Sequence, residues 1–170
     1  YKDQLGPMMA TYVMPCFSSP HPHLRSKAVW VSGVFCDTTF PDGTNQGPTY
    51  MRFFEQVVRC LGDPELPVRV DAVVSLRHFL EEMEDVSPVA PALPQLLNSI
   101  FGLMNQVDQE DLVFTLEVLV DKFGDCIGPY ATQMAAQLVG AFWKYCAAAD
   151  EDTEGDEDAA GIAAFGCMRA

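Results

Sequence analysis

The sequence predicts an all-α protein, a right-handed α-solenoid built from repeated helix pairs. Three observations support this fold class. Apolar residues recur at three- and four-residue steps through long stretches, which is the period of an amphipathic helix. No segment shows convincing alternation of apolar and polar residues over the length of a strand. One helical segment recurs at intervals of 44 residues, and repeats of that length are typical of solenoids.

The reference helix of this repeat covers residues 63–82, with the sequence DPELPVRVDAVVSLRHFLEE. Pro64 and Pro67 lie at its start, where a missing amide donor costs little and the fixed φ angle already suits a helix. Its charged residues mostly fall off the apolar face. The residues that share this face, which continues just past the segment, are Val68, Ala72, Leu76, Phe79 and Met83.

Related segments lie 44 residues before and after it, HPHLRSKAVWVSGVFCD at 21–37 and DQEDLVFTLEVLVDKFGD at 108–125. In this register Phe35, Phe79 and Phe123 align, and each is followed two residues later by a carboxylate. Phe accounts for only 11 of the 170 residues, so the alignment is not coincidental. We expect each of the three rings to be buried between the helices of its own unit and the next.

Four further helices precede these segments as the first members of helix pairs. We expect Pro15 to kink the first of them and Pro94 to kink the third. The fourth pair is truncated in its second helix. The expected first helices are residues 3–18, 49–61, 88–106 and 129–148, and the approximate units are 1–44, 45–86, 87–126 and 127–170.

A helix pair of this kind cannot cover its own apolar surface, so neighbouring pairs must stack on it. The whole chain is therefore predicted to be one segment of HEAT-like units. HEAT units typically carry an Asp six residues before the Arg that opens the second helix, and these charges form a ladder between repeats. Asp63 and Arg69 have this spacing, Ser19 and Arg25 keep the arginine alone, and the third unit has neither residue.

The order of motifs along the chain resembles one family. The segment VMPCFSSPHPHLRSKAVWVSGVF at 13–35 is followed one repeat later by LGDPELPVRVDAVVSLRHFL at 61–80. An acidic loop and Ala-Ala-Gly-Ile follow the fourth first helix. This arrangement resembles the importin-β superfamily of nuclear transport receptors, closest to the importin-seven/eight branch, over nearly the whole chain. We expect the chain to be an internal segment of a longer receptor.

The resemblance implies a nuclear import receptor that shuttles between cytoplasm and nucleus. Such receptors bind protein cargo in the cytoplasm, cross the pore and release the cargo when the small GTPase Ran binds in its GTP form. Second helices line an inner surface for cargo and Ran, and first helices offer grooves to phenylalanine-glycine nucleoporins. The family's best-defined Ran contacts lie near the receptor's N-terminus, so they can fall outside this segment. The alternatives are a HEAT scaffold subunit of another complex and an exportin, which binds cargo together with Ran.

Composition excludes several other functions. The net charge of −14 argues against direct contact with nucleic acid, because phosphates need a basic face. No apolar run approaches the roughly 18 residues of a membrane span. No catalytic motif is present, so we predict neither an enzyme nor a cofactor. Cys16, His21 and His23 lack the fourth ligand of a structural zinc site, and six scattered cysteines indicate free thiols.

Two groups of charged residues are candidate partner contacts. Residues 150–158 hold seven carboxylates in nine positions, half of the net charge. This run is either a tolerated insertion or an electrostatic contact that steers a basic protein cargo. For the basic residues of the second helices we favour stacking or solvated charge, because exposed ion pairs contribute little. Trp30 is expected in the core. The candidate partner-binding residues are Arg25, Arg69, Asp150, Glu151, Asp152, Glu154, Asp156, Glu157 and Asp158.

Overall fold

The computed structural model describes residues 2–40, 42, 47–107, 109–151 and 167–168. Every regular element within these ranges is helical, which confirms the predicted all-α, HEAT-like architecture. The chain forms two compact units, Tyr1–Asp85 and Val86–Ala170. Their boundary falls next to the one expected between the second and third repeats. None of the helices in the described part of the chain is long and apolar enough to cross a membrane.

The first helix of unit one changes type along its length. It begins as α1 (Lys2–Met8), continues as the π-helical turn η1 (Met9–Val13) and ends as the 3-10 turn η2 (Met14–Ser18). Pro15 lies at the start of η2, where its missing amide removes a donor from the regular α-helical pattern. The disturbance predicted at Pro15 is thus a change of helix type.

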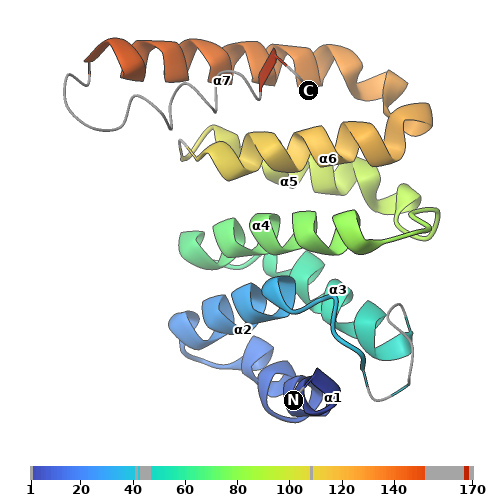
Figure 1. Ribbon diagram of the computed structural model, residues 1–170. Helices are drawn as coiled ribbons and strands as arrows, with labels where there is room; N and C mark the ends of the chain where they lie inside the picture. Colours follow the sequence, from blue (N-terminus) through green and yellow to red (C-terminus); the bar gives the residue numbers. More distant parts are fainter. Residues whose placement is uncertain (1, 41, 43–46, 108, 152–166, 169–170) are drawn as a thin grey trace. The chain divides into compact units, whose positions relative to one another are not determined.

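Three further helices complete unit one (Figure 1). They are α2 (Pro22–Val34), α3 (Pro48–Cys60) and α4 (Leu66–Glu82). Each carries a proline in its first turn, as the sequence predicted for the reference helix. The elements therefore follow the order first helix, second helix, first helix, second helix.

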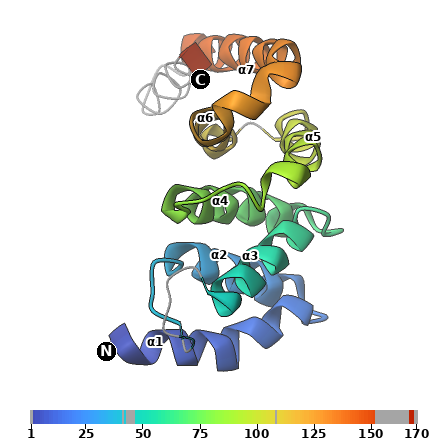
Figure 2. The ribbon, with the colours of Figure 1, turned by 90° about the vertical axis from the view of Figure 1, so that its right-hand side faces the viewer.

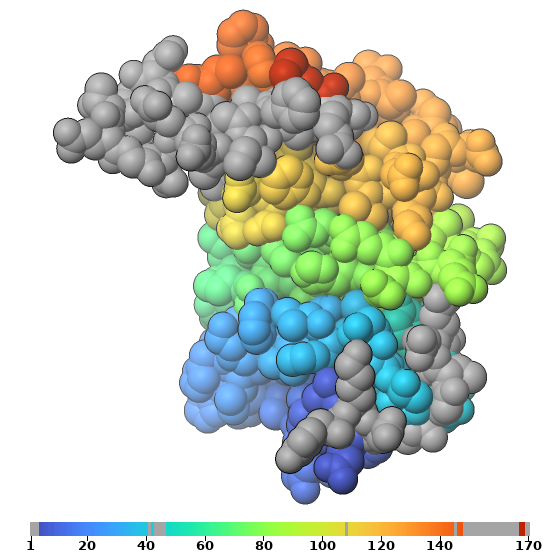
Figure 3. All heavy atoms as spheres, viewed as in Figure 1, coloured from blue at the N-terminus to red at the C-terminus, as the bar shows by residue number. Residues whose placement is uncertain are grey.

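The two second helices, α2 and α4, lie side by side (Figure 1 and Figure 2). Their backbones approach closely because Gly33 faces Ser75. A Cβ atom on Gly33 would lie 2.6 to 2.8 Å from atoms of Ser75. The Ser75 hydroxyl also donates a hydrogen bond of 2.9 Å to the Val29 carbonyl. The space-filling view shows the surfaces of α2 and α4 in contact (Figure 3).

Aromatic rings form the core of unit one. The rings of Tyr50 and Phe79 pack edge to face with centroids 5.0 Å apart, and those of Phe40 and Phe53 stack at 5.4 Å. The Tyr50 hydroxyl donates a 2.7 Å hydrogen bond to the Phe79 carbonyl. Burial raises the pKa of Tyr50 well above its ordinary value, so the phenol stays a donor.

The expected burial of the three aligned phenylalanines is right for two of them. Phe79 is 0% exposed and Phe123 is 3% exposed, but Phe35 is 38% exposed. The reason lies in the partner helix. Phe79 packs against Tyr50 and Phe54 of α3. One repeat earlier the corresponding residues are Gly6 and Ala10, which are too small to cover Phe35.

Unit two repeats the helix-pair order. It contains η3 (Ala90–Ala92), α5 (Leu93–Met104), α6 (Glu110–Ile127), η4 (Gly128–Tyr130) and α7 (Ala131–Glu151). We expected Pro94 to kink the first helix of the third pair, but it does not. Pro94 lies in the first turn of α5, where a proline is tolerated. Both helices contribute buried apolar residues, among them Leu96, Leu97 and Ile100 of α5 and Leu112, Leu116 and Leu119 of α6.

Candidate partner-binding surfaces

Arg25 at the start of α2 binds Asp63, which precedes α4, through two hydrogen bonds. Its Nε lies 2.7 Å from Asp63 Oδ2 and its Nη2 lies 2.8 Å from Oδ1. A third donor, Nη1, reaches the Ser19 carbonyl at 2.9 Å. The Arg25 hydrogen bond lowers the pKa of Asp63, and the same contact raises the pKa of Arg25. The pair is a bidentate ion pair that joins the two helix pairs.

Arg69 occupies the same position in the second pair. Its Nη1 donates to the backbone carbonyls of Asp63 at 2.8 Å and Pro64 at 3.1 Å. Arg25 does the equivalent at Ser19, six residues before it. The carboxylate of Asp63 thus pairs with the arginine of the preceding repeat, as a ladder between repeats requires. This geometry gives Arg25 a role in stacking and Arg69 a role in holding the turn before α4, and the contact of either with a partner stays a prediction.

Trp30 on α2 is exposed, and the expectation that it is buried in the core was wrong. Its side chain is 44% exposed, and Lys27 Nζ lies 5.4 Å from the ring centroid. Successive helical residues are about 100° apart, so Trp30 points about 200° away from buried Ala28. The offset of two residues from the apolar stripe was the sequence signal for this exposure.

Carboxylates lie near both ends of α2 in unit one. The Ser26 hydroxyl donates a hydrogen bond to Asp71 Oδ2, one helical turn before Trp30. At the other end of α2, burial and, to a smaller extent, nearby carboxylates together raise the pKa of the Cys36 thiol to about 12. Those carboxylates are Glu82, Asp37 and Glu81. The exposed surface of α2 and α4 therefore combines an aromatic ring with negative charge.

The acidic run at 150–158 lies mostly outside the described residues. Asp150 and Glu151 form the end of α7, which runs three residues further than the expected 129–148. The remaining five candidates, Asp152, Glu154, Asp156, Glu157 and Asp158, lie outside the described part of the chain. A role for the run in partner binding stays a prediction.

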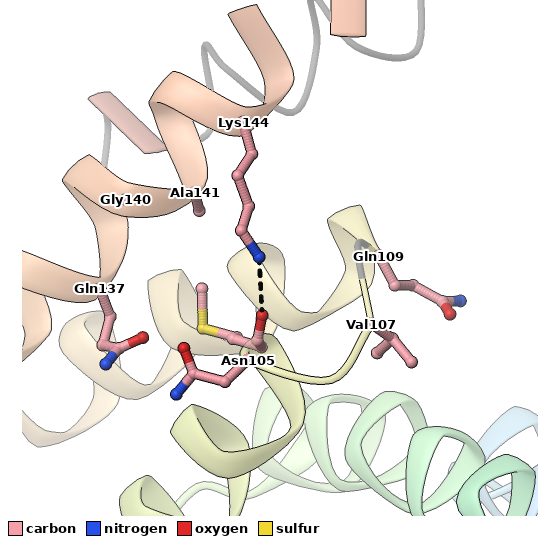
Figure 4. A pocket seen from close by; sticks show the side chains of 8 residues that line it. Asn105, Val107, Gln109, Gln137, Gly140, Ala141 and Lys144 are labelled. Atoms are coloured by element: carbon pink, nitrogen blue, oxygen red, sulfur yellow. Dashed lines mark hydrogen bonds between the residues drawn. The ribbon is translucent and has the colours of Figure 1, made fainter. Parts of the chain in front are cut away.

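A small hollow in unit two lies between the end of α5 and α7 (Figure 4). Lys144 Nζ lies 3.4 Å from the Met104 carbonyl, where it complements the negative end of the α5 dipole. Asn105, Gln109 and Gln137 also line this space, whose volume is about 60 Å³. Ligand pockets usually measure about 300 to 1,000 Å³, so this hollow suits water better than a cofactor.

A larger apolar groove lies between α6 and α7 in the same unit. Its volume is about 490 Å³, and Val120, Ile127, Leu138 and Phe142 are among the side chains that line it. Among the described residues no group of three His, Cys, Asp or Glu side chains is placed to hold a metal ion. The rings of His21 and His23 stack on each other with centroids 5.5 Å apart.

The full length of the chain aligns with a protein of Arabidopsis thaliana called "Importin beta-like SAD2 homolog". The two are 44% identical over 170 residues, which is 100% of this chain and 16% of that protein. The chain belongs to the importin-β-like family. Within this family it is also 31% identical over 169 residues to "Probable importin-7 homolog" of Dictyostelium discoideum. It is 22% identical over 161 residues to "Importin-8" of Danio rerio.

These importin-β-like relatives are much longer than the chain, which spans 15 to 16% of their length. The alignments still cover 93 to 100% of the chain itself. No family model and no solved structure matches the sequence. The assignment to the importin-β-like family therefore comes from these proteins, and it agrees with the resemblance in motif order.

Proposed function

We propose that this chain is a cargo-holding segment of a nuclear import receptor. The observation that carries the proposal is its 44% identity, over its whole length, with an importin-β-like protein. The receptor would bind protein cargo on its helix pairs and carry it through the nuclear pore, between cytoplasm and nucleus. Binding of the small GTPase Ran in its GTP form would control cargo release.

The charge of the chain supports a basic cargo. Asp and Glu number 24 against 10 Lys and Arg, and seven of the carboxylates lie within residues 150–158. A field of one sign raises the local concentration of an oppositely charged partner and speeds its association. The acidic run would attract the cargo, and Arg25 and Arg69 would contact it only where the stacking ladder leaves donors accessible.

Cargo transport by such a receptor requires binding and a change of shape, and no catalysed reaction. In a solenoid each repeat contacts only its neighbours, so small changes at successive interfaces add up along the array. The Arg25–Asp63 pair lies at one such interface, between α2 and α4. We infer that cargo-bound and Ran-bound states differ by small shifts at contacts of this type. Phenylalanine-glycine nucleoporins would bind the outer first helices.

A pull-down of the full-length protein with Ran locked in its GTP form tests this proposal. An import receptor binds Ran-GTP and releases a bound basic cargo. Binding of cargo together with Ran-GTP would instead identify an exporter. Absence of Ran binding would remove both transport functions and favour a HEAT scaffold subunit of another complex. Ran in its GDP form is the matched control.

A further inference from the structure

The exposed apolar residues of α2 and its C-cap, Phe35, fall into two rows. Leu24 and Phe35 form one row, and both are about two-fifths exposed. Their counterparts one repeat later, Val68 and Phe79, are completely buried. This row of α2 therefore lacks the cover that Tyr50 and Phe54 of α3 give to Phe79 one repeat later.

Trp30 and Val34 form the second row, and it behaves differently. Their counterparts on α4 are Val74 and His78, which stay partly exposed although α2 packs against α4. A helix pair that stacked on α2 in the same way would therefore leave Trp30 accessible. Trp30 accordingly lies on a surface that remains open to a partner in a longer array.

The ring of Trp30 already attracts a cation. Lys27 Nζ lies 5.4 Å from its centroid, and both side chains are exposed. An exposed cation–π contact contributes only about 0.5 to 1 kcal/mol. A flexible lysine at such a site can be displaced by a cation that makes additional hydrogen bonds.

Asp71 provides an acceptor for those hydrogen bonds. Ser26 and Trp30 are four residues apart on α2, so their side chains share a face. Ser26 donates to one oxygen of Asp71, Oδ2, which brings the carboxylate to this face. A carboxylate about one helical turn from an indole ring, on the same face, matches the guanidinium group, which stacks on aromatic faces and donates several hydrogen bonds. An ammonium group is a more strongly hydrated point charge and matches the pair less well.

We propose that Trp30 and Asp71 form an arginine-binding subsite for a segment of a basic protein, with Lys27 covering the ring until that arginine displaces it. The identification of this partner as cargo rests on the proposed function. The subsite itself rests on the exposure of Trp30, the position of Lys27 and the Ser26–Asp71 contact.

Tryptophan fluorescence tests the subsite directly, because the chain has only two tryptophans. In a Trp143→Phe background, Trp30 is the sole indole reporter. The probe is a nine-residue peptide of alternating Arg and Ala, titrated at low salt into the full chain. We expect saturable quenching or a shift of Trp30 emission. Matched Lys–Ala and Glu–Ala peptides should give weaker binding and no binding, respectively.

Two variants separate specific recognition from general attraction to a negative chain. Asp71→Asn should weaken the binding seen by Trp30 about tenfold, within the range of a charge-assisted contact. Lys27→Gln should bind at least as tightly as the parent, because it removes the competing cation. The reverse background, Trp30→Phe with Trp143 retained, controls for binding elsewhere and should show no comparable response. Far-ultraviolet circular dichroism checks that each variant keeps its helices.

Unchanged Trp30 emission with the Arg–Ala peptide would overturn the subsite. So would equal affinities of the parent and Asp71→Asn, or equal affinities for the Arg and Lys peptides. The Ran experiment tests the import function separately. If Trp30 binds the peptide but the full-length protein fails to bind Ran-GTP, the subsite stands and the import function falls. The opposite pair of results removes the subsite alone.

Discussion

Arg25 and Asp63 are 38 residues apart, yet their side chains meet in a two-point ion pair with N–O distances of 2.7 and 2.8 Å. The side chain of Arg25 is 14% exposed and that of Asp63 is 8% exposed, so water competes little for this contact. The pair ties the start of α2 to the turn before α4. It is therefore the polar counterpart of the close Gly33–Ser75 approach between the same helices.

The first prediction concerns the pH dependence of stability. An unfolded Asp has a pKa of about 3.9, and the Arg25 hydrogen bond lowers the pKa of Asp63 in the folded chain. The stability from this pair is thus fully present above about pH 4 and is lost as the pH falls through the folded pKa. We expect Asp63→Asn to have a lower Tm than the parent at pH 6. Between pH 5 and pH 3, the Tm of the variant should fall by less than the Tm of the parent. Parallel Tm curves over that interval would show that the pair contributes nothing.

The second prediction concerns the contact between α2 and α4. In Gly33→Ala the new methyl group would lie within 2.8 Å of three Ser75 atoms, one of them the backbone Cα. We expect a loss of about 1 to 3 kcal/mol in the free energy of unfolding, the usual effect of overpacking. Ser75→Ala should not rescue this loss, because the Cα and Cβ atoms remain.

Gly102→Ala is the matched control for that substitution. A Cβ atom at Gly102, inside α5, meets nothing within 4 Å. Alanine is favoured over glycine in a helix by roughly 0.5 to 1 kcal/mol, so this variant should keep or gain stability. Urea denaturation measures both. Equal effects of the two substitutions would refute the close approach of α2 and α4.

The third prediction compares two repeat-equivalent phenylalanines. Phe79→Ala removes a fully buried ring that packs on Tyr50 and Phe54, and should cost about 3 to 5 kcal/mol. Phe35→Ala removes a ring that is 38% exposed, and should cost less than about 1 kcal/mol. Chemical denaturation of both variants under identical conditions tests the difference. A Phe79→Ala loss below about 1 kcal/mol would contradict the core described for unit one.

Helix periodicity was a good predictor of the helices and a poor one of burial at particular positions. The 44-residue register placed the second helices α2, α4 and α6 correctly, because an apolar stripe depends only on local spacing. The truncated fourth second helix falls mostly outside the described residues and stays a prediction. The register failed at Phe35 because burial there depends on Gly6 and Ala10 of another helix. Trp30 is a large aromatic residue expected in the core, but its angular position on α2, two residues past Ala28, takes it away from the buried stripe.

The candidate site was predictable only in part. The spacing of six residues between Asp63 and Arg69 predicted the ladder. It places the Asp in the turn before the second helix and the Arg near the start of that helix. The pairing of Asp63 with Arg25 across 38 residues could not be read from one unit alone. The contact of Ser26 with Asp71 likewise depends on how α2 and α4 pack, and no local motif marks it.

The fourth prediction concerns the acidic run at 150–158. If these carboxylates steer a basic cargo, replacing all seven with Asn and Gln should slow association roughly tenfold at low salt. The difference should shrink as salt rises, because charges are screened beyond about 8 Å at 0.15 M ionic strength. Stopped-flow mixing of the full-length receptor with a basic cargo measures the rates. Equal rates for parent and variant at low salt would reduce the run to a spacer.

Nuclear import by the full-length protein tests the central claim most directly. A fluorescent basic cargo is added to permeabilised cells with the purified receptor, with Ran and GTP present or Ran omitted. The proposed function predicts that cargo accumulates in nuclei only when both receptor and Ran are supplied. A control cargo whose basic residues are replaced by neutral ones should not accumulate. Nuclear accumulation that is the same with and without the receptor would contradict the proposed function.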